Sequence, residues 1–173
     1  MTYDVLYVDP PWAYGNTQLI DGDIKNAKDA YPTMNLKELK AFELPPLSDD
    51  CVMFMWTTGP WMGGAIELGS AWGFKYSTVA FVWDKVHTNP GFYTNSQVEY
   101  CLLFKKGKIP SPRGTRNEKQ LLVEKRTVHS KKPAEIRTRI ERMFPTQTRI
   151  EMFARNTSPG WDVMGNETTK YDS

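Results

Sequence analysis

The chain has 173 residues, of which 40% are apolar and 13% aromatic, so it can bury a substantial core within a single domain over residues 1–173. Its net charge of +2 says little about partners, and no apolar stretch approaches the roughly 20 residues of a membrane span. Two cysteines within apolar runs and two unclustered histidines argue against a disulfide scaffold or a structural zinc site, so no metal is expected. The N-terminus shows no basic-then-apolar leader, which predicts a cytoplasmic protein with no membrane partner.

Strand and helix patterns alternate along the chain. The first predicted strand covers residues 4–8, is apolar on both faces, and leads into a long polar loop over 13–34. A second polar loop is expected over 84–96. Strands are further predicted at 51–57, 75–83, 98–107, 121–128, 148–154 and 161–165, and helices at 35–42, 60–73 and 132–144. This alternation predicts an α/β fold whose sheet contains parallel strands.

Three polar residues follow the carboxyl ends of predicted strands. Asp9 comes after the first strand, Arg155 after the strand at 148–154, and Asn166 after the strand at 161–165. Ligand sites in open α/β sheets lie beyond the carboxyl ends of the strands. We therefore expect these distant residues to share one crevice.

The first strand ends in the tetrapeptide Asp9-Pro10-Pro11-Trp12. Asp9 offers carboxylate oxygens, and no N–H donor follows the Pro10 carbonyl because Pro11 lacks one. Two oxygen acceptors in a rigid frame suit the exocyclic amine of a nucleobase, and the Trp12 ring offers a face on which the base can stack. Accepting both N–H bonds would favour a pyramidal nitrogen whose lone pair is free for attack. The alternative is a simple strand stop followed by a core tryptophan.

A basic segment covers residues 105–126. It holds eight Lys or Arg residues and two Glu residues, whereas the rest of the chain carries a net negative charge. Such a segment on an acidic body predicts contact with a nucleic-acid backbone, and a solvated loop is the alternative. The candidate nucleic-acid-binding residues are Lys105, Lys106, Lys108, Arg113 and Arg116.

The tetrapeptide at 9–12 is identified as the catalytic signature of the amino-methyltransferases, which methylate adenine N6 or cytosine N4 with S-adenosylmethionine. The whole chain resembles their MT-A branch, named for the seventy-kilodalton subunit of the messenger RNA adenosine methyltransferase. The other blocks that carry the resemblance are YPTM at 31–34, MFMWTTG at 53–59, WGFKYSTVAFVWDK at 72–85, VEYCLLFKKG at 98–107, HSKKPAEIRTRIERMFP at 129–145 and RIEMFARNTSPGWDVMGNE at 149–167. The resemblance implies a Rossmann-like methyltransferase domain with a mixed, mostly parallel central sheet flanked by helices. It also implies a permuted motif order, with the catalytic block first and the cofactor block last.

The same resemblance implies which residues bind the cofactor, S-adenosylmethionine. Lys132, at the start of a predicted helix, would meet the cofactor carboxylate, and a helix N-terminus itself favours an anion. Glu151, Phe153 and Arg155 would line the ribose and adenine, because alternation along a strand places them on one face.

Asn166 and Glu167 would reach the ribose hydroxyls, since amide and carboxylate oxygens suit a diol. The chain departs from the family in two respects. Better-known members have a His-Asn pair after the equivalent of Arg155, whereas residues 156–158 here are Asn-Thr-Ser. Larger members also have a strand before the catalytic one whose end helps to bind the cofactor adenine, so this chain must build its adenine pocket otherwise.

Together these features predict an enzyme that methylates the 6-amino group of adenine in nucleic acid. DNA is favoured over RNA, because the chain resembles the small stand-alone members of bacteria and phages. Two alternatives stay open: a catalytically silent nucleic-acid-binding subunit, and a cytosine-N4 methyltransferase. The chain is expected to be a monomer or a homodimer.

Overall fold

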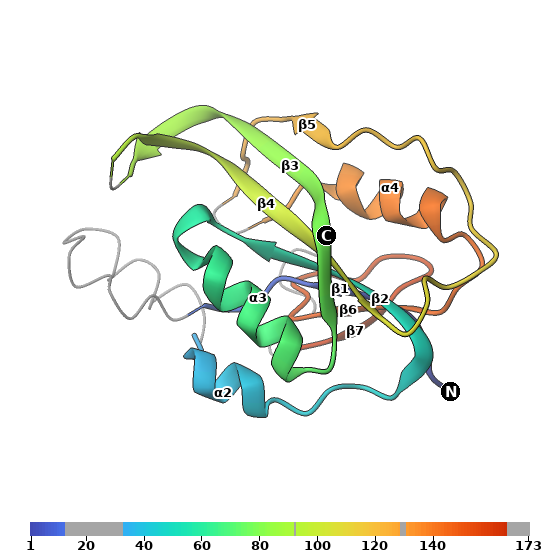
Figure 1. Ribbon diagram of the computed structural model, residues 1–173. Coiled ribbons are helices and arrows are strands. Elements are labelled where there is room, and N and C mark those ends of the chain that lie inside the picture. The colour runs from blue at the N-terminus through green and yellow to red at the C-terminus, as the bar shows by residue number, and fades with distance from the viewer. Residues whose placement is uncertain (13–32, 92, 129–130, 166–173) are drawn as a thin grey trace.

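The computed structural model describes residues 1–12, 33–91, 93–128 and 131–165, and the described strands form one seven-stranded sheet (Figure 1). The strands are β1 (Tyr3–Val8), β2 (Leu47–Thr57), β3 (Lys75–Pro90), β4 (Asn95–Lys106), β5 (Leu121–Val123), β6 (Arg149–Met152) and β7 (Asp162–Met164). The helices are α2 (Leu36–Ala41), α3 (Met62–Ala71) and α4 (Ala134–Met143), and a short 3-10 turn at Gly59–Trp61 precedes α3.

The strands lie in the spatial order β5-β3-β4-β2-β1-β6-β7. β2, β1, β6 and β7 run parallel, β5 is parallel to β3, and β4 is antiparallel to both of its neighbours. The predicted mixed, mostly parallel sheet is therefore confirmed. The carboxyl ends of β1 and β6 meet at one edge, which is where such sheets bind ligands.

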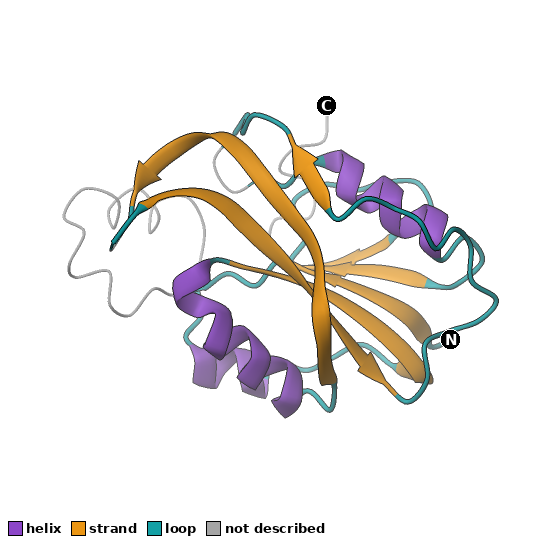
Figure 2. Ribbon diagram, turned by 45° about the horizontal axis from the view of Figure 1, so that its top comes forward, coloured by secondary structure: helices purple, strands orange, loops and turns teal. Residues whose placement is uncertain are grey.

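Helices cover both faces of the sheet (Figure 2). On one face α2 and α3 contribute the buried Leu39 and Leu68 to an apolar core, and α3 packs so closely that a Cβ on Gly69 would lie 2.3 Å from the Phe104 ring. On the other face α4 buries Ile140 in a second core. No helix in the described ranges is both long enough and apolar enough to cross a bilayer.

Local signals set the start of α2 and of α4. Asn35 caps α2 by accepting the Glu38 N–H at 2.8 Å, while the Glu38 carboxylate accepts the Asn35 N–H at 3.2 Å. This reciprocal pair is a capping box. Pro133 directly precedes α4, where a missing N–H costs nothing, so Lys132 lies just before the N-terminal turn of that helix.

The predicted polar loop over residues 84–96 is wrong. β3 continues to Pro90 and β4 begins at Asn95, so the two strands form a long antiparallel ribbon (Figure 2). Its register shifts between Asp84 and Asn89, which marks a bulge. The loop prediction failed because these residues are polar on both faces of the ribbon, so they lack the apolar alternation that signals a half-buried strand.

Other predicted boundaries differ more modestly. β2 begins at Leu47 instead of residue 51, and β5 ends at Val123 instead of residue 128. Most of the predicted loop at 13–34 lies outside the described residues. Asn166 and Glu167 also lie outside them.

Candidate active site

Asp9 lies at the carboxyl end of β1, between the ends of β2 and β6. The preceding residue, Val8, pairs with Met55 on one side and Met152 on the other. The Asp9 N–H donates to the Met152 carbonyl at 3.4 Å, and the Asp9 side chain is 20% exposed. Asp9 is thus held by the sheet at its ligand-binding edge, with part of its carboxylate reachable from solvent.

A chain of four charged side chains begins at Asp9. Lys132 Nζ lies 3.4 Å from Asp9 Oδ2 and 3.2 Å from Glu99 Oε1. The other oxygen of Glu99, Oε2, lies 3.4 Å from Lys85 Nζ. These groups are largely shielded from water, so salt screens their attraction less than that of surface pairs. This series of ion pairs links Asp9 to the base of the β3–β4 ribbon.

The environment shifts the pKa values of the two carboxyls in opposite directions. Burial raises the pKa of Asp9, Lys132 and Arg155 oppose the rise, and the Glu99 carboxylate adds to it. Burial also acts to raise the pKa of Glu99, but Lys132 and Lys85 together outweigh it and hold that pKa below its ordinary value. Asp9 is therefore the carboxyl of this site that protonates more readily as the pH falls.

Lys132 and Arg155 both lie beside Asp9. Lys132 is held by two carboxylates and lies over the Trp56 ring, with Nζ 5.7 Å from the ring centroid. Arg155 is 7% exposed and close enough to Asp9 to lower its pKa. The structure thus gathers one carboxylate and two cations from segments far apart in the sequence, at the edge where Asp9 and Arg155 were predicted to meet.

Glu151 is buried on β6 and is bound by a residue of α4. Arg137 Nε and Nη2 donate to Glu151 Oε1 at 2.9 and 2.6 Å. Burial raises the pKa of Glu151, and Arg137 opposes that rise. The carboxylate predicted to line the cofactor site therefore already has a close partner on the α4 face of the sheet.

The predicted placement of residues 151, 153 and 155 on one strand face is wrong. β6 ends at Met152, and Phe153 adopts a left-handed backbone with φ of 59°, so alternation stops there. The Phe153 ring turns to the opposite face and packs against Phe42, with centroids 4.8 Å apart. A Cβ on Gly165 would lie 2.8 Å from the Phe153 backbone, so this bend also depends on a glycine in the last described turn.

Two parts of the tetrapeptide make contacts that the sequence does not predict. The Pro10 carbonyl accepts the Trp12 N–H at 2.8 Å, which leaves one of its two lone pairs for another donor. The Trp12 ring is 5% exposed and stacks on Trp61, with centroids 5.8 Å apart. This burial matches the alternative of a core tryptophan and does not favour stacking of a base on Trp12, which stays an untested prediction.

The structure does not bring Lys105, Lys106 and Lys108 to Asp9. Lys105 pairs with Val52 at the start of the parallel block, which is roughly 13 Å along the strand from the level of Asp9. Lys106 Nζ donates to the Ser48 carbonyl at 3.4 Å at the same end. Their predicted contact with nucleic acid stays untested, but they lie at the opposite end of the strands from Asp9.

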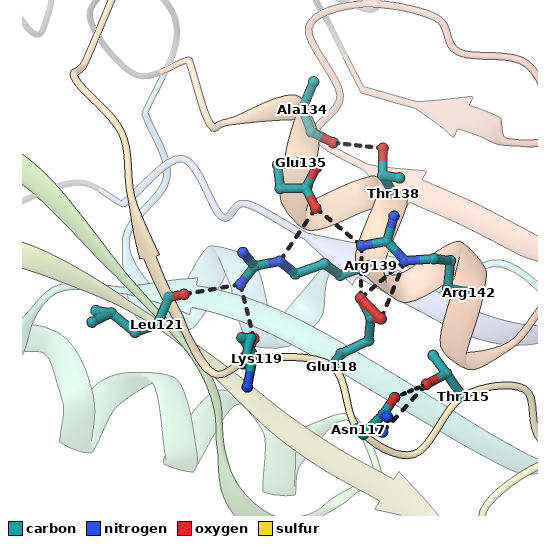
Figure 3. A network of polar contacts seen from close by, with 10 residues as sticks. All are labelled: Thr115, Asn117, Glu118, Lys119, Leu121, Ala134, Glu135, Thr138, Arg139 and Arg142. Atoms are coloured by element: carbon teal, nitrogen blue, oxygen red, sulfur yellow. Dashed lines mark hydrogen bonds and ion pairs between the residues drawn. The ribbon is translucent and has the colours of Figure 1, made fainter.

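Residues 118–121, in the middle of the basic segment, run beside α4 and bond to it (Figure 3). Arg142 of the helix pairs with Glu118 at 2.6 Å, and Arg139 donates to the carbonyls of Lys119 and Leu121 at 2.8 and 3.1 Å. These contacts fix the segment to the fold and give it a structural role.

The two arginines predicted to bind nucleic acid differ in exposure. Arg113 is half-buried, with its guanidinium 5.5 Å from the Phe144 ring centroid, whereas Arg116 is exposed. Only Arg116 therefore presents its side chain to solvent in the way that a backbone contact requires.

Three charged residues of the site were not predicted: Lys85, Glu99 and Arg137. A signal existed for Glu99, because a lone acid in the apolar run VEYCLLF must find a cation if it is buried. No comparable signal existed for Lys85 or Arg137. Their partners lie 14 residues away along the chain in each case, across a ribbon or between a helix and a strand.

Comparison with known proteins shows the family to which the chain belongs. The MT-A70 family model matches residues 3–167. The chain belongs to the MT-A70 family. Members of this family are adenine-N6 methyltransferases that use S-adenosylmethionine, so the family resemblance, the reaction class and the cofactor predicted from the sequence are confirmed.

Individual relatives differ in how much of them the chain covers. It is 50% identical to the Type II methyltransferase M.MunI of a Mycoplasma species over 180 residues, covering 95% of this chain and 77% of that protein. It is 30% identical to an MT-A70-like N(6)-adenosine-methyltransferase of Arabidopsis thaliana and 29% identical to the human N(6)-adenosine-methyltransferase catalytic subunit METTL3. It spans 24% and 28% of the length of those two proteins.

Proposed function

We propose that the chain transfers the methyl group of S-adenosylmethionine to the 6-amino group of adenine in DNA. The observation that carries the proposal is the Asp9 carboxylate, held at the carboxyl end of β1 beside Lys132 and Arg155. A carboxylate fixed at this end of the sheet can accept a hydrogen bond from an amine, and the cations beside it oppose the rise in its pKa that burial causes. We further propose that the protein acts in the cytoplasm as a monomer or a homodimer.

Asp9 and Pro10 divide the work of orienting the target amine. The Asp9 carboxylate accepts one N–H of the amine, and the free lone pair of the Pro10 carbonyl accepts the other. Both acceptors are fixed by the end of β1 and by two prolines, so they lose little conformational entropy when the amine binds. Asp9 is also the nearest base for the proton that the nitrogen releases on methylation.

The charged groups at this edge fit the cofactor. When bound, S-adenosylmethionine supplies an electrophilic methyl group on a positively charged sulfur. Lys132 and Arg155 can meet its carboxylate, while Glu99 can provide negative charge for its ammonium group. Cofactor roles for Glu151, with Phe153, Asn166 and Glu167, remain predictions from the family resemblance.

DNA is proposed over RNA on the pattern of relatives. The chain matches most of the length of a bacterial Type II methyltransferase, whereas it covers about a quarter of the relatives named for adenosine.

Two measurements test this function. Transfer of a radiolabelled methyl group should label duplex DNA above RNA of the same sequence, and an adenine-free duplex should serve as the unlabelled control. Calorimetry should detect binding of the cofactor. Absence of both label and binding heat would favour the silent subunit, and label in RNA alone would reject the DNA assignment.

A further inference from the structure

The ribbon formed by the distal halves of β3 and β4 extends beyond every other strand in the described part of the chain. β5 ends where Val123 pairs with Asp84, and β2 ends where Thr57 pairs with Tyr100. Past these pairs β3 and β4 bond only to each other, and Figures 1 and 2 show them projecting from the sheet. The ribbon therefore reaches roughly 10 Å or more past its last neighbours.

The ribbon is placed at the catalytic edge of the sheet. Lys85 and Glu99 form its base, and Glu99 is linked through Lys132 to Asp9 by contacts of 3.2 and 3.4 Å. Its position relative to the catalytic carboxylate is thus fixed by ion pairs shielded from water.

A bulge sets the direction in which the ribbon leaves the sheet. Val86 has a φ of 70°, and Asp84 Oδ1 holds the bend by accepting the Val86 N–H at 2.8 Å and the Gln97 amide at 2.9 Å. A bonded bulge of this kind re-aims the strands beyond it. Both acids at the base, Asp84 and Glu99, are thereby engaged within the protein.

The chemistry of the ribbon suits a nucleic-acid groove. Residues 85–98 contain no Asp or Glu, so nothing on the ribbon repels phosphates. Among its described residues the large apolar or aromatic side chains are few, namely Val86 and Val98 on the strands and the fully exposed Tyr93. The exposed side chains able to form hydrogen bonds are His87, Thr88, Tyr93, Thr94, Asn95 and Ser96.

We propose that residues 86–91 and 93–97 belong to an arm that enters a groove of duplex DNA beside the target adenine and reads neighbouring base pairs. This inference rests on the proposed function. A major groove about 12 Å wide admits a two-stranded ribbon, and side chains such as Asn and Ser bond to base edges there. A protein partner is less well matched, because interface cores need clustered apolar side chains that this ribbon lacks.

The test compares two variants of the same strands. The arm variant is Thr88→Ala/Asn95→Ala/Ser96→Ala, and the control is Ser77→Ala/Thr78→Ala, which removes exposed polar groups from the opposite end of β3. Both act on duplexes that carry one adenine flanked by randomised base pairs, and methylated products are sequenced. Melting temperature, cofactor binding and oligomeric state are measured in parallel.

The arm variant should keep its melting temperature and cofactor affinity, while its preference at one or more flanking positions falls by about tenfold. The control should retain the wild-type preference. The inference is overturned if the wild type shows no preference, if the arm variant keeps it, or if only the oligomeric state changes. A wild type that methylates no nucleic acid at all rejects the proposed function itself.

Discussion

The charged side chains at the two ends of the central strands differ in burial and in pairing. At the carboxyl end of β1, Asp9, Lys132 and Glu99 are mostly buried and paired with one another. At the other end, Lys105 and Lys108 are exposed side chains on the surface. Buried, paired charges are costly to assemble and mark chemistry, whereas exposed lysines cost little. The end of the strands at which the fold places a charged side chain is therefore more informative about function than the number of charges in its segment.

The largest expected effect is at Asp9. Asp9→Asn keeps the size of the side chain but replaces one carboxylate oxygen by an NH₂ group, which cannot accept a hydrogen bond from the target amine. We expect single-turnover methyl transfer to fall by about 10²–10³-fold. Cofactor affinity measured by calorimetry should change only a few-fold. Near-normal turnover would refute the assigned role.

Trp12 separates a packing role from a stacking role. Because the ring is buried against Trp61, Trp12→Ala should destabilise the fold by about 3–5 kcal/mol in chemical denaturation. Trp12→Phe keeps an aromatic ring and should retain more activity under conditions where both variants are folded. Equal rates of the two folded variants would mean that the aromatic face contributes nothing to catalysis.

The basic segment allows a direct test of the two edges. Lys125 and Arg126 are exposed and follow Glu124, whose N–H donates to the Asp84 carbonyl at the end of the sheet that holds Asp9. Lys125→Ala/Arg126→Ala should lower the salt slope of DNA binding by about 0.9 for each phosphate that the variant no longer neutralises. Lys105→Ala/Lys108→Ala removes two exposed lysines from the other end of the strands and should leave the slope almost unchanged. The reverse order would place the DNA on the far edge.

The smallest expected effect is a shift of a pH profile. In the proposed mechanism the ionised Asp9 accepts the target amine, so the rate should fall as the pH drops through its raised pKa. Glu99→Gln removes a negative charge that raises this pKa, and Asp9 then becomes the one carboxylate paired with Lys132 among the described contacts. The acid limb of the pH–rate profile should therefore move to lower pH. A limb that stays in place or moves upward would show that Glu99 does not act on Asp9.

Much of the sheet is predictable because its strands are short apolar runs buried on both faces, as in residues 4–8 and 51–57. The meeting of Asp9 and Arg155 also follows from the positions of strand ends, and the position of Lys132 follows from a helix start. Such features depend on local patterns and on one rule about parallel sheets.

The remaining features depend on contacts between distant segments. The ribbon resembles a loop in the sequence because neither of its faces is buried. Lys85 gives no signal because its partner lies across that ribbon, and alternation misplaces Phe153 because a left-handed residue follows the end of β6. For Trp12 the sequence leaves a core position open as an alternative, but it does not identify the partner, Trp61, which lies 49 residues further on.

Identification of the methylated nucleoside tests the central claim most directly. Duplex DNA is incubated with S-adenosylmethionine and either the wild type or Asp9→Asn, digested to nucleosides and analysed by mass spectrometry. We predict N6-methyldeoxyadenosine with the wild type and a level lower by about 10²-fold or more with the variant. N4-methyldeoxycytidine as the product, or equal N6-methyldeoxyadenosine from both proteins, would contradict the assignment of Asp9 and of adenine.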